Sequence, residues 1–308
     1  MPLVGLVDPS YDEREEDEPG RLPRWMTLHE VLEASATADP SWSPWPYEML
    51  NGAISEWQER DYISTSLLTG GCSRGKVIER LEDIILTVDE MYASLRGTLV
   101  HRALQFASRP NSLAEARFFT TVKLPGLRES IEVSCSPDII TWNPNSLGDY
   151  KVTESPPSRY PWKGHTNQVT WNQYIVRHAE RWTMNDQPFD LPFDNRAWVP
   201  EHLYLVYLGP KRPETMEVMK TIDVKTPTNR TVRRRMPYIA PDKDIEAALF
   251  PRIKAMSQAL ASYPEWPWDE EVPGFEGPPG WACPGSPWCK LPNCTAKRWP
   301  NGLWWKNP

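Results

Sequence analysis

Apolar residues at helical spacing predict the helices that flank a region of strands. The segment 75–86 has apolar residues at 77, 78, 81, 84 and 85, which share one face of a helix. Thr87 and Glu90 form a capping-box pair, which predicts a second helix running to residue 107. Two later segments, 165–182 and 242–263, show the same pattern, and Pro251 should bend the last one.

Strands are predicted where β-branched and aromatic residues gather between turn residues. Two such stretches, 117–124 and 130–135, lead into a hairpin with strands Ser136–Trp142 and Leu147–Thr153, joined by Asn-Pro-Asn-Ser. A further hairpin is expected to join 201–209 to 215–224 across a Gly-Pro turn. Helices before and after a small mixed sheet make an α/β or α+β core, and α/β is the class that we expect.

The first hairpin carries charges where packing alone would favour apolar residues. Asp149, Lys151 and Thr153 share one face of their strand, and the turn brings Asp138 nearly opposite that pair. Two converging carboxylates repel unless a cation lies between them, and oxygen ligands of this kind suit Mg²⁺ or Mn²⁺. The alternative is a solvated hairpin face with no ligand.

A histidine on the second predicted helix offers a further metal ligand. Gly97 and His101 are four residues apart and therefore share a face, so the missing side chain clears space one turn before the imidazole. Histidine binds manganese beside carboxylates. A lone helical histidine is, however, more often a surface or core residue than a ligand.

Composition indicates a soluble protein of ordinary hydrophobicity. The 308 residues are 40% hydrophobic and 24% charged, although 33 prolines and 16 tryptophans are unusual. No apolar run approaches the roughly 18 residues that span a bilayer, and the N-terminus lacks the basic start and apolar stretch of a signal peptide. We expect an intracellular, cytoplasmic protein with no membrane span.

The charge is distributed unevenly along the chain. Of the net −7, residues 12–18 contribute −5, whereas residues 281–308 carry four cations and no acid. Arg74, Lys76, the triplet 233–235 and the basic C-terminus offer contacts to a DNA backbone, although solvated surface explains each equally well. The tryptophans at 281, 288, 299, 304 and 305 offer stacking for a single strand, or packing around a metal cluster.

Clustered cysteines indicate a metal site. Cys283, Cys289 and Cys294 lie within 12 residues, and an intracellular cluster of this kind favours metal binding over disulfides. Three local thiols need a fourth ligand, which Cys72 or Cys135 could supply. Free, partly buried thiols are the alternative.

Six motifs follow one another along the chain. In order they are STSLLTGGCSR, Gly97-x-x-x-His101, Pro137-Asp138, Asp149-x-Lys151, Gln168 on a helix, and the three C-terminal cysteines. Each motif alone is common, but their joint order is specific. This order resembles the RecB-like branch of the PD-(D/E)xK nucleases that carry an iron–sulfur cluster, above all the CRISPR-associated exonucleases (the fourth Cas protein) and AddB nuclease domains. The resemblance covers about residues 62–299.

The resemblance implies a role for each residue of the site. His101, Asp138 and Asp149 would bind Mg²⁺ or Mn²⁺ with the Tyr150 carbonyl, Lys151 would position or activate water, and Gln168 would assist. The 4Fe-4S cluster would be held by Cys72, Cys283, Cys289 and Cys294. The gaps of five and four residues between the last three cysteines differ from the family pattern and leave zinc as a second occupant. The family has a tyrosine four residues after the glutamine, but this sequence has Asn172 at that position. The nearest tyrosine, Tyr174, is a poor match to the family's tyrosine.

The resemblance implies a restriction-endonuclease-like α/β core in a metal-dependent DNA exonuclease, and it is also the source of the expected substrate, single-stranded ends, and of the expected 5′-to-3′ polarity. The expected parts are a Pro/Trp-rich acidic extension at 1–61, with a short helix after the capping pair Thr27 and Glu30, a nuclease core at 62–225, and a helix with the cysteine segment at 226–308. DNA and proteins of recombination, repair or CRISPR adaptation are the expected partners. A non-catalytic DNA-binding or scaffolding subunit is the alternative.

Overall fold

The computed structural model has a mixed α/β fold, as expected for the class. It describes residues 3–7, 25–36, 62–69, 76–77, 84–86, 88–105, 110–153, 155–158, 161–225 and 231–262. The chain forms two compact units. The first unit comprises Met1–Asp61, Gly71–Leu99 and Ala255–Pro308, and the second comprises Tyr62–Gly70 and Val100–Lys254. His101 and the charged hairpin belong to the second unit.

In the first unit, strand β1 (Leu3–Val7) pairs antiparallel with β2 (Trp25–Thr27) and parallel with β4 (Ile84–Leu86). Helix α1 (Leu28–Ala36) follows β2 directly. The predicted capping box is confirmed: the Glu30 N–H donates to Thr27 Oγ1 at 3.3 Å, and the Thr27 N–H donates to the Glu30 carboxylate at 2.7 Å.

The helix predicted over 75–86 is wrong at its end. Ile84 and Ile85 lie in β4 and pair with β1, about 80 positions earlier in the chain. β-branched residues suit a strand at least as well as a helix, so a distant partner decides between the two. The second predicted helix is confirmed as α5 (Val88–Gln105), and Thr87 of its expected capping pair lies outside the described residues.

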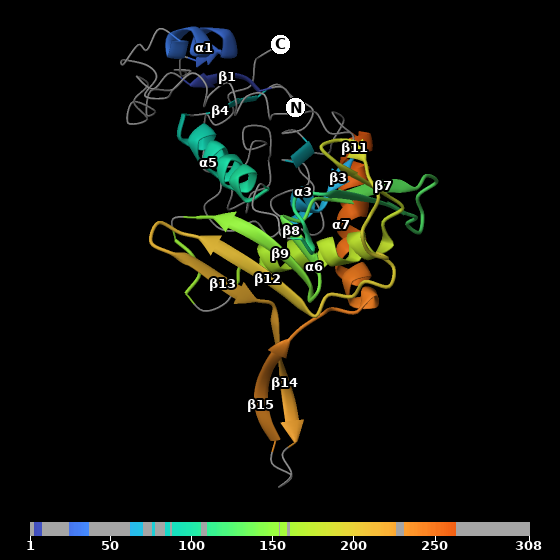
Figure 1. Ribbon diagram of the computed structural model, residues 1–308. Helices are drawn as coiled ribbons and strands as arrows, with labels where there is room; N and C mark the ends of the chain where they lie inside the picture. Colours follow the sequence, from blue (N-terminus) through green and yellow to red (C-terminus); the bar gives the residue numbers. More distant parts are fainter. Residues whose placement is uncertain are drawn as a thin grey trace, which may run out of the picture. The chain divides into compact units, whose positions relative to one another are not determined.

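The described part of the second unit includes two five-stranded mixed sheets in place of the one small sheet expected (Figure 1). One sheet has the order β11-β10-β6-β7-β3, and the other has the order β13-β12-β9-β8-β5. Each has one parallel pair, β3 with β7 and β9 with β12. The first sheet comprises β3 (Ile63–Ser64), β6 (Arg117–Val122), β7 (Ile131–Cys135), β10 (Arg181–Met184) and β11 (Gln187–Pro188). The second comprises β5 (Ser112–Leu113), β8 (Ile139–Trp142), β9 (Asn145–Val152), β12 (His202–Leu208) and β13 (Pro213–Glu217).

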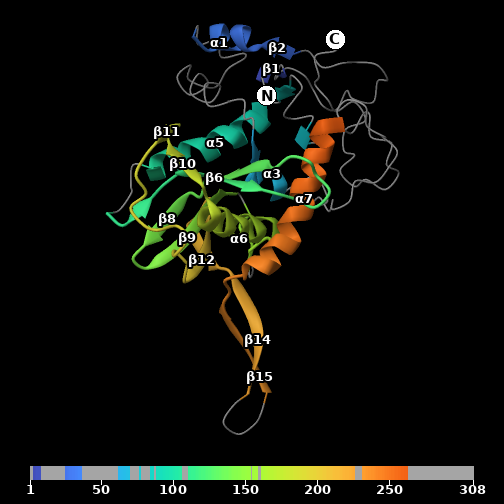
Figure 2. The same ribbon diagram turned by 90° about the vertical axis from the view of Figure 1, so that its right-hand side faces the viewer.

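Helix α6 (Lys163–His178) contacts strands of both sheets and carries much of the core (Figure 2). Val169, Trp171 and Ile175 on this helix are buried. The short helix α3 (Thr65–Thr69) packs on α6, and Thr65 Oγ1 donates to Asn172 Oδ1 at 2.6 Å. The helix predicted over 242–263 is confirmed as α7 (Asp242–Ser262), which contains Pro251 in its interior.

The helix predicted over 165–182 ends four residues early. Ala179 is extended, and Arg181 and Trp182 form β10, where Arg181 pairs with Phe119. Asn195 Nδ2 donates to the carbonyls of Val176 at 3.0 Å and of Ala179 at 3.1 Å. A side chain from a distant loop therefore satisfies carbonyls at the helix end, so the chain can leave the helix there.

The strand predicted over 215–224 is divided at Val218. Its first part lies in β13, and its second part is β14 (Met219–Lys225), which pairs with β15 (Thr231–Pro237) in a separate two-stranded sheet. The Val218 N–H donates to the Leu203 carbonyl at 2.8 Å, and the Val218 carbonyl accepts from the Tyr238 N–H at 2.9 Å. These two bonds join the separate ribbon to the second sheet.

Candidate metal and catalytic site

The β8–β9 hairpin places the two predicted aspartates opposite each other. Ile139 pairs with Gly148, so Asp138 and Asp149 follow as the next residues on the two antiparallel strands. Asp138 is 5% exposed and Asp149 is 1% exposed. The alternative of a solvated hairpin face is therefore wrong, because both carboxylates are buried.

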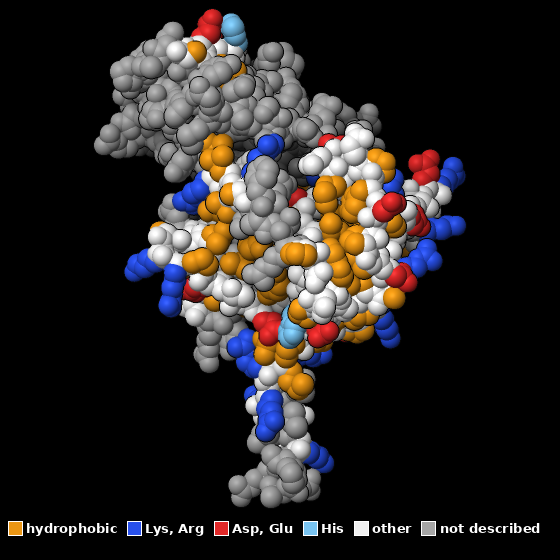
Figure 3. Space-filling view, viewed as in Figure 1, with side chains coloured by type: hydrophobic (Ala, Val, Ile, Leu, Met, Phe, Trp, Pro, Cys, Tyr) orange, Lys and Arg blue, Asp and Glu red, His pale blue; other side chains and the backbone are white. Residues whose placement is uncertain are grey.

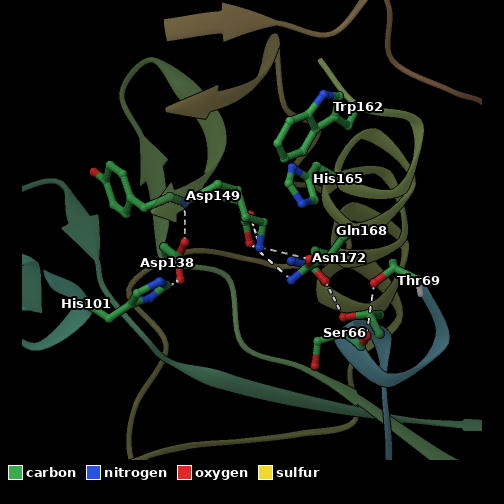
Figure 4. A network of polar contacts seen from close by, with 12 residues as sticks. Ser66, Thr69, His101, Asp138, Asp149, Trp162, His165, Gln168 and Asn172 are labelled. Carbon is green, nitrogen blue, oxygen red and sulfur yellow. Dashed lines mark hydrogen bonds and ion pairs between the residues drawn. The ribbon is translucent and has the colours of Figure 1, made fainter. Parts of the chain in front are cut away.

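Asp138 is held by contacts from its own hairpin and from α5. Its Oδ2 accepts a hydrogen bond from the Tyr150 N–H, and its Oδ1 lies 2.8 Å from His101 Nδ1. Figure 4 shows His101 directed at Asp138 from the helix. The strand pair and the end of α5 thus bring together two residues that are 37 positions apart in the chain.

Glu115 is a candidate site residue that the sequence did not reveal. Its Oε1 lies 2.8 Å from His101 Nδ1, and Ser136 Oγ donates to its backbone carbonyl at 3.2 Å. The backbone of Glu115 has φ of 57°, which non-glycine residues adopt seldom and often at functional sites. Its signal in the sequence is one acid just before the strand that begins at residue 117, which is too little to single it out.

Among the described residues, His101, Glu115 and Asp138 form a group whose ligand atoms all lie within 4.8 Å of one another. An imidazole with two carboxylates is a donor set that suits Mn²⁺, and the carboxylates suit Mg²⁺ as well. The residues present therefore fit the divalent ion that the sequence predicted. Glu115 stands in this group where Asp149 was expected.

Asp149 instead closes a ring of contacts with Lys151 and Gln168. Lys151 Nζ lies 2.6 Å from Asp149 Oδ2 and donates to Gln168 Oε1 at 3.0 Å. Gln168 Nε2 donates to Asp149 Oδ1 at 3.2 Å. Figure 4 shows Gln168 reaching from α6 toward the strand. The three residues that the sequence assigned to catalysis beside Asp138 thus contact one another directly.

The buried carboxylates perturb the titration of their neighbours. Burial raises the pKa of Asp138 to about 7, the negative charge of Asp149 adds to this rise, and His101 opposes it. Burial alone would lower the pKa of His101, but hydrogen bonds and charge from Asp138 and Glu115 raise it to about 10. The protonated His101 ring therefore supplies the positive charge between Asp138 and Glu115. A bound divalent ion would supply this charge instead, with the His101 ring neutral.

An aromatic group lies beside the lysine. The Tyr207 hydroxyl accepts from the backbone N–H of Trp162 at 3.1 Å and lies 3.2 Å from His165 Nδ1. Burial and, to a smaller extent, the charge of Lys151 together lower the pKa of His165 to about 4. Trp162 is exposed and its ring centroid lies 5.1 Å from that of His165. The sequence interpretation did not single out these three residues.

The structure also places the residues that the resemblance treated as poor matches. Tyr174 donates to Glu246 Oε1 at 3.1 Å and so faces α7, while Asn172 is buried and bonded to Thr65. Cys135, one of the two residues considered as a fourth cluster ligand, is a buried free thiol with Sγ 3.7 Å from the Asn172 carbonyl. An added Cβ at Gly97 would meet no atom within 4 Å.

Several predicted residues lie outside the described part of the chain. They are the four proposed cluster ligands Cys72, Cys283, Cys289 and Cys294, together with Arg74, the basic C-terminus and the five C-terminal tryptophans. Within the described residues, no helix is long and apolar enough to cross a membrane.

Comparisons with known proteins identify no family. No family model matches the sequence, and no curated protein matches it. Among solved structures, the chain is similar to one titled "Crystal structure of SSO0001", with a TM-score of 0.42 and 14% identity. That likeness covers 79% of this chain and 90% of the other.

Proposed function

We propose that this protein is a divalent-metal-dependent deoxyribonuclease with a restriction-endonuclease-like core of the RecB-like type. One observation carries the proposal: two buried carboxylates, Asp138 and Asp149, face each other across one strand pair, with an imidazole against the first and an ammonium against the second. Such a set costs folding free energy, since apolar residues of similar volume would pack there without desolvating charge. Perturbed, buried groups of this kind mark functional sites.

The metal would be held by His101, Glu115 and Asp138, whose ligand atoms lie together, and the resemblance adds Asp149 and the Tyr150 carbonyl to this set. When bound, Mg²⁺ or Mn²⁺ supplies positive charge against a phosphate and lowers the pKa of water. In the protein itself, Ser136 fixes the backbone of Glu115, and the Tyr150 N–H fixes one oxygen of Asp138. Both contacts orient ligands before substrate arrives.

Lys151 is the residue that we assign to the reacting phosphate. Its ammonium is restrained by Asp149 and Gln168, while the side chain keeps 20% of its surface exposed. A restrained cation stabilises the charge that develops on a phosphate in the transition state, or orients the attacking water. The neutral His165 nearby leaves Lys151 as the cation on this side of the site.

The substrate that we propose is the end of a single DNA strand, with 5′-to-3′ polarity, in recombination, repair or CRISPR spacer processing. Exposed Trp162 beside the site offers a face for base stacking. A 4Fe-4S cluster on Cys72, Cys283, Cys289 and Cys294, with zinc as the less expected occupant, belongs to the same proposal and takes no part in the chemistry at the hairpin. A DNA-binding subunit without turnover is the second candidate, but it would have no use for two buried, facing acids.

Purified protein tests this proposal with single-stranded DNA labelled at either end, in Mn²⁺, in Mg²⁺ and in EDTA. We expect the wild type to cleave the DNA in Mn²⁺ and in Mg²⁺ but not in EDTA. We expect Asp149→Ala and Lys151→Ala to lose this cleavage. Asp190→Ala and Lys211→Ala are the matched controls, because both side chains are exposed and far from these contacts in sequence. Wild-type rates in either site variant would overturn the assignment.

A further inference from the structure

The β14–β15 ribbon is a basic arm that neither sheet covers. Among the residues that the structure describes, its two strands pair only with each other, from Met219 with Pro237 to Lys225 with Thr231. Figures 1 and 2 show the arm extending from the end of the second sheet. An isolated two-stranded ribbon has little stability of its own. A partner that binds along it is therefore a natural reason for its presence.

The charge of the arm is opposite to that of the chain. Its fourteen strand residues contain five cations and one acid, a net +4, whereas the whole chain has a net charge of −7. Figure 3 shows lysine and arginine side chains along the stem. The Arg233 side chain is 83% exposed even though Nε lies 3.5 Å from Asp223. Such a concentration of cations favours a polyanion.

The register divides these cations between the two faces of the arm. Thr221 pairs with Arg235, Asp223 with Arg233, and Lys225 with Thr231, so these six exposed residues share one face. Lys220 and Arg234 alternate with them and lie on the opposite face. A ribbon with cations on both faces can contact phosphates on both walls of a groove.

The root of the arm is fixed to the sheet that carries the proposed site. Val218 bonds to Leu203, and Leu203 pairs with Leu147 on β9, two residues before Asp149. Tyr238 at the other root donates to Asp244 Oδ2 at 3.2 Å, and Lys220 Nζ lies 4.6 Å from its ring centroid. Seven residues a strand give the arm a reach of roughly 23 Å, which corresponds to about seven base pairs.

We propose that the arm binds the phosphate backbone of duplex DNA that flanks the single-stranded end to be cut. This inference deepens the proposed function and rests on it for the identity of the partner. A two-stranded ribbon fits the major groove of a duplex. The arm strands contain no aromatic residue, whereas surfaces that bind single strands use aromatic stacking. Duplex DNA therefore fits the arm better than a single strand does.

The test measures DNA binding by fluorescence anisotropy in EDTA, where no metal-dependent cleavage occurs. The probes are a duplex longer than the arm with a single-stranded tail, and the tail alone. In Lys225→Gln/Arg233→Gln/Arg235→Gln, we expect the Kd for the tailed duplex to rise at least about tenfold, and the slope of log K against log salt to fall by roughly two to three. Binding of the tail alone should be unchanged.

The matched control is Lys123→Gln/Arg128→Gln/Arg196→Gln, which removes three exposed cations of the same unit. Equal weakening by both triple variants would overturn the proposal, since bulk charge would then explain the effect. Unchanged duplex binding by the arm variant would also overturn it. Labelled poly-glutamate serves as a third probe, and an arm effect confined to it would overturn the proposal by indicating an acidic protein partner. Thermal melting of both variants checks that the fold is retained.

The arm proposal and the nuclease proposal fail separately. If the wild type cleaves single strands but the arm variant binds the tailed duplex like the wild type, only the arm inference is wrong. If the wild type binds the duplex through the arm but cleaves nothing in Mn²⁺, the arm inference stands and the nuclease assignment is wrong.

Discussion

Gln168 and Lys151 face each other between helix α6 and strand β9, with 3.0 Å between the amide oxygen and the ammonium nitrogen. The same amide donates its N–H to Asp149 at 3.2 Å. One neutral side chain therefore satisfies a buried anion and a neighbouring cation together. This bridge sets the position of the ammonium by the packing of a helix rather than by the strand alone.

Replacing Gln168 with methionine should lower both stability and nuclease rate. Methionine has nearly the same length as glutamine, but it offers no donor to Asp149 and only a weak acceptor to Lys151. Hydrogen bonds to charged groups contribute about 1.5–3 kcal/mol each. We expect a loss of about 2 kcal/mol in the free energy of unfolding, measured by denaturant titration. Gln187→Met, at an exposed position, is the control. An unchanged midpoint for the Gln168 variant would show that the bridge contributes nothing.

Glu115→Gln should weaken metal binding. The change keeps the shape and a hydrogen-bonding group beside His101 but removes one of the two negative charges in the ligand group. We expect the Kd for Mn²⁺ to rise at least about tenfold, measured by titration with EPR detection of free Mn²⁺. Glu129→Gln removes an exposed charge and should leave the Kd unchanged. The same Kd in all three proteins would exclude Glu115 from the site.

Gly148→Ala should destabilise the strand that carries Asp149. A Cβ at this position would overlap ring carbons of Tyr204 on the paired strand, so the ring would have to move. We expect a loss of about 1–2 kcal/mol on denaturation, most of which disappears in a Tyr204→Ala background. Gly97→Ala, which meets no atom within 4 Å, should be neutral or stabilising by about 0.5–1 kcal/mol. A Gly148 variant as stable as wild type would contradict this packing.

Acidification should lower the stability of the folded protein, because His165 is neutral in the fold and has a lowered pKa. Its pKa is lowered to about 4 in the folded protein, whereas the unfolded chain takes up the proton near pH 6.5. Between these values the unfolded state binds more protons, so stability falls as the pH falls from about 6.5 to 4, by up to about 3 kcal/mol. His165→Phe removes this contribution, so its denaturation free energy should fall less over the same range. Parallel curves for the two proteins would contradict the shift.

Local patterns predicted the hairpin, because turn residues and alternating side chains determine which residues face each other. Asp138, Asp149 and Lys151 were found for that reason. Glu115 was missed because its partner His101 comes from helix α5, and no local pattern encodes that packing. The strand at Ile84 and Ile85 was missed for the same reason, as its partner β1 lies far away in the chain. The strand β15 was missed because three consecutive arginines resemble a solvated loop.

The most direct measurement compares Mn²⁺ occupancy with DNA cleavage, at the same Mn²⁺ concentrations, in the wild type and in Asp138→Asn. Asp138 contacts His101 and the Tyr150 N–H, and asparagine keeps its shape without its charge. We predict that cleavage of labelled single-stranded DNA rises in step with occupancy in the wild type, and that Asp138→Asn loses both together. Wild-type cleavage in Asp138→Asn with an unchanged dependence on Mn²⁺, or a saturated wild type that leaves the DNA intact, would contradict the account.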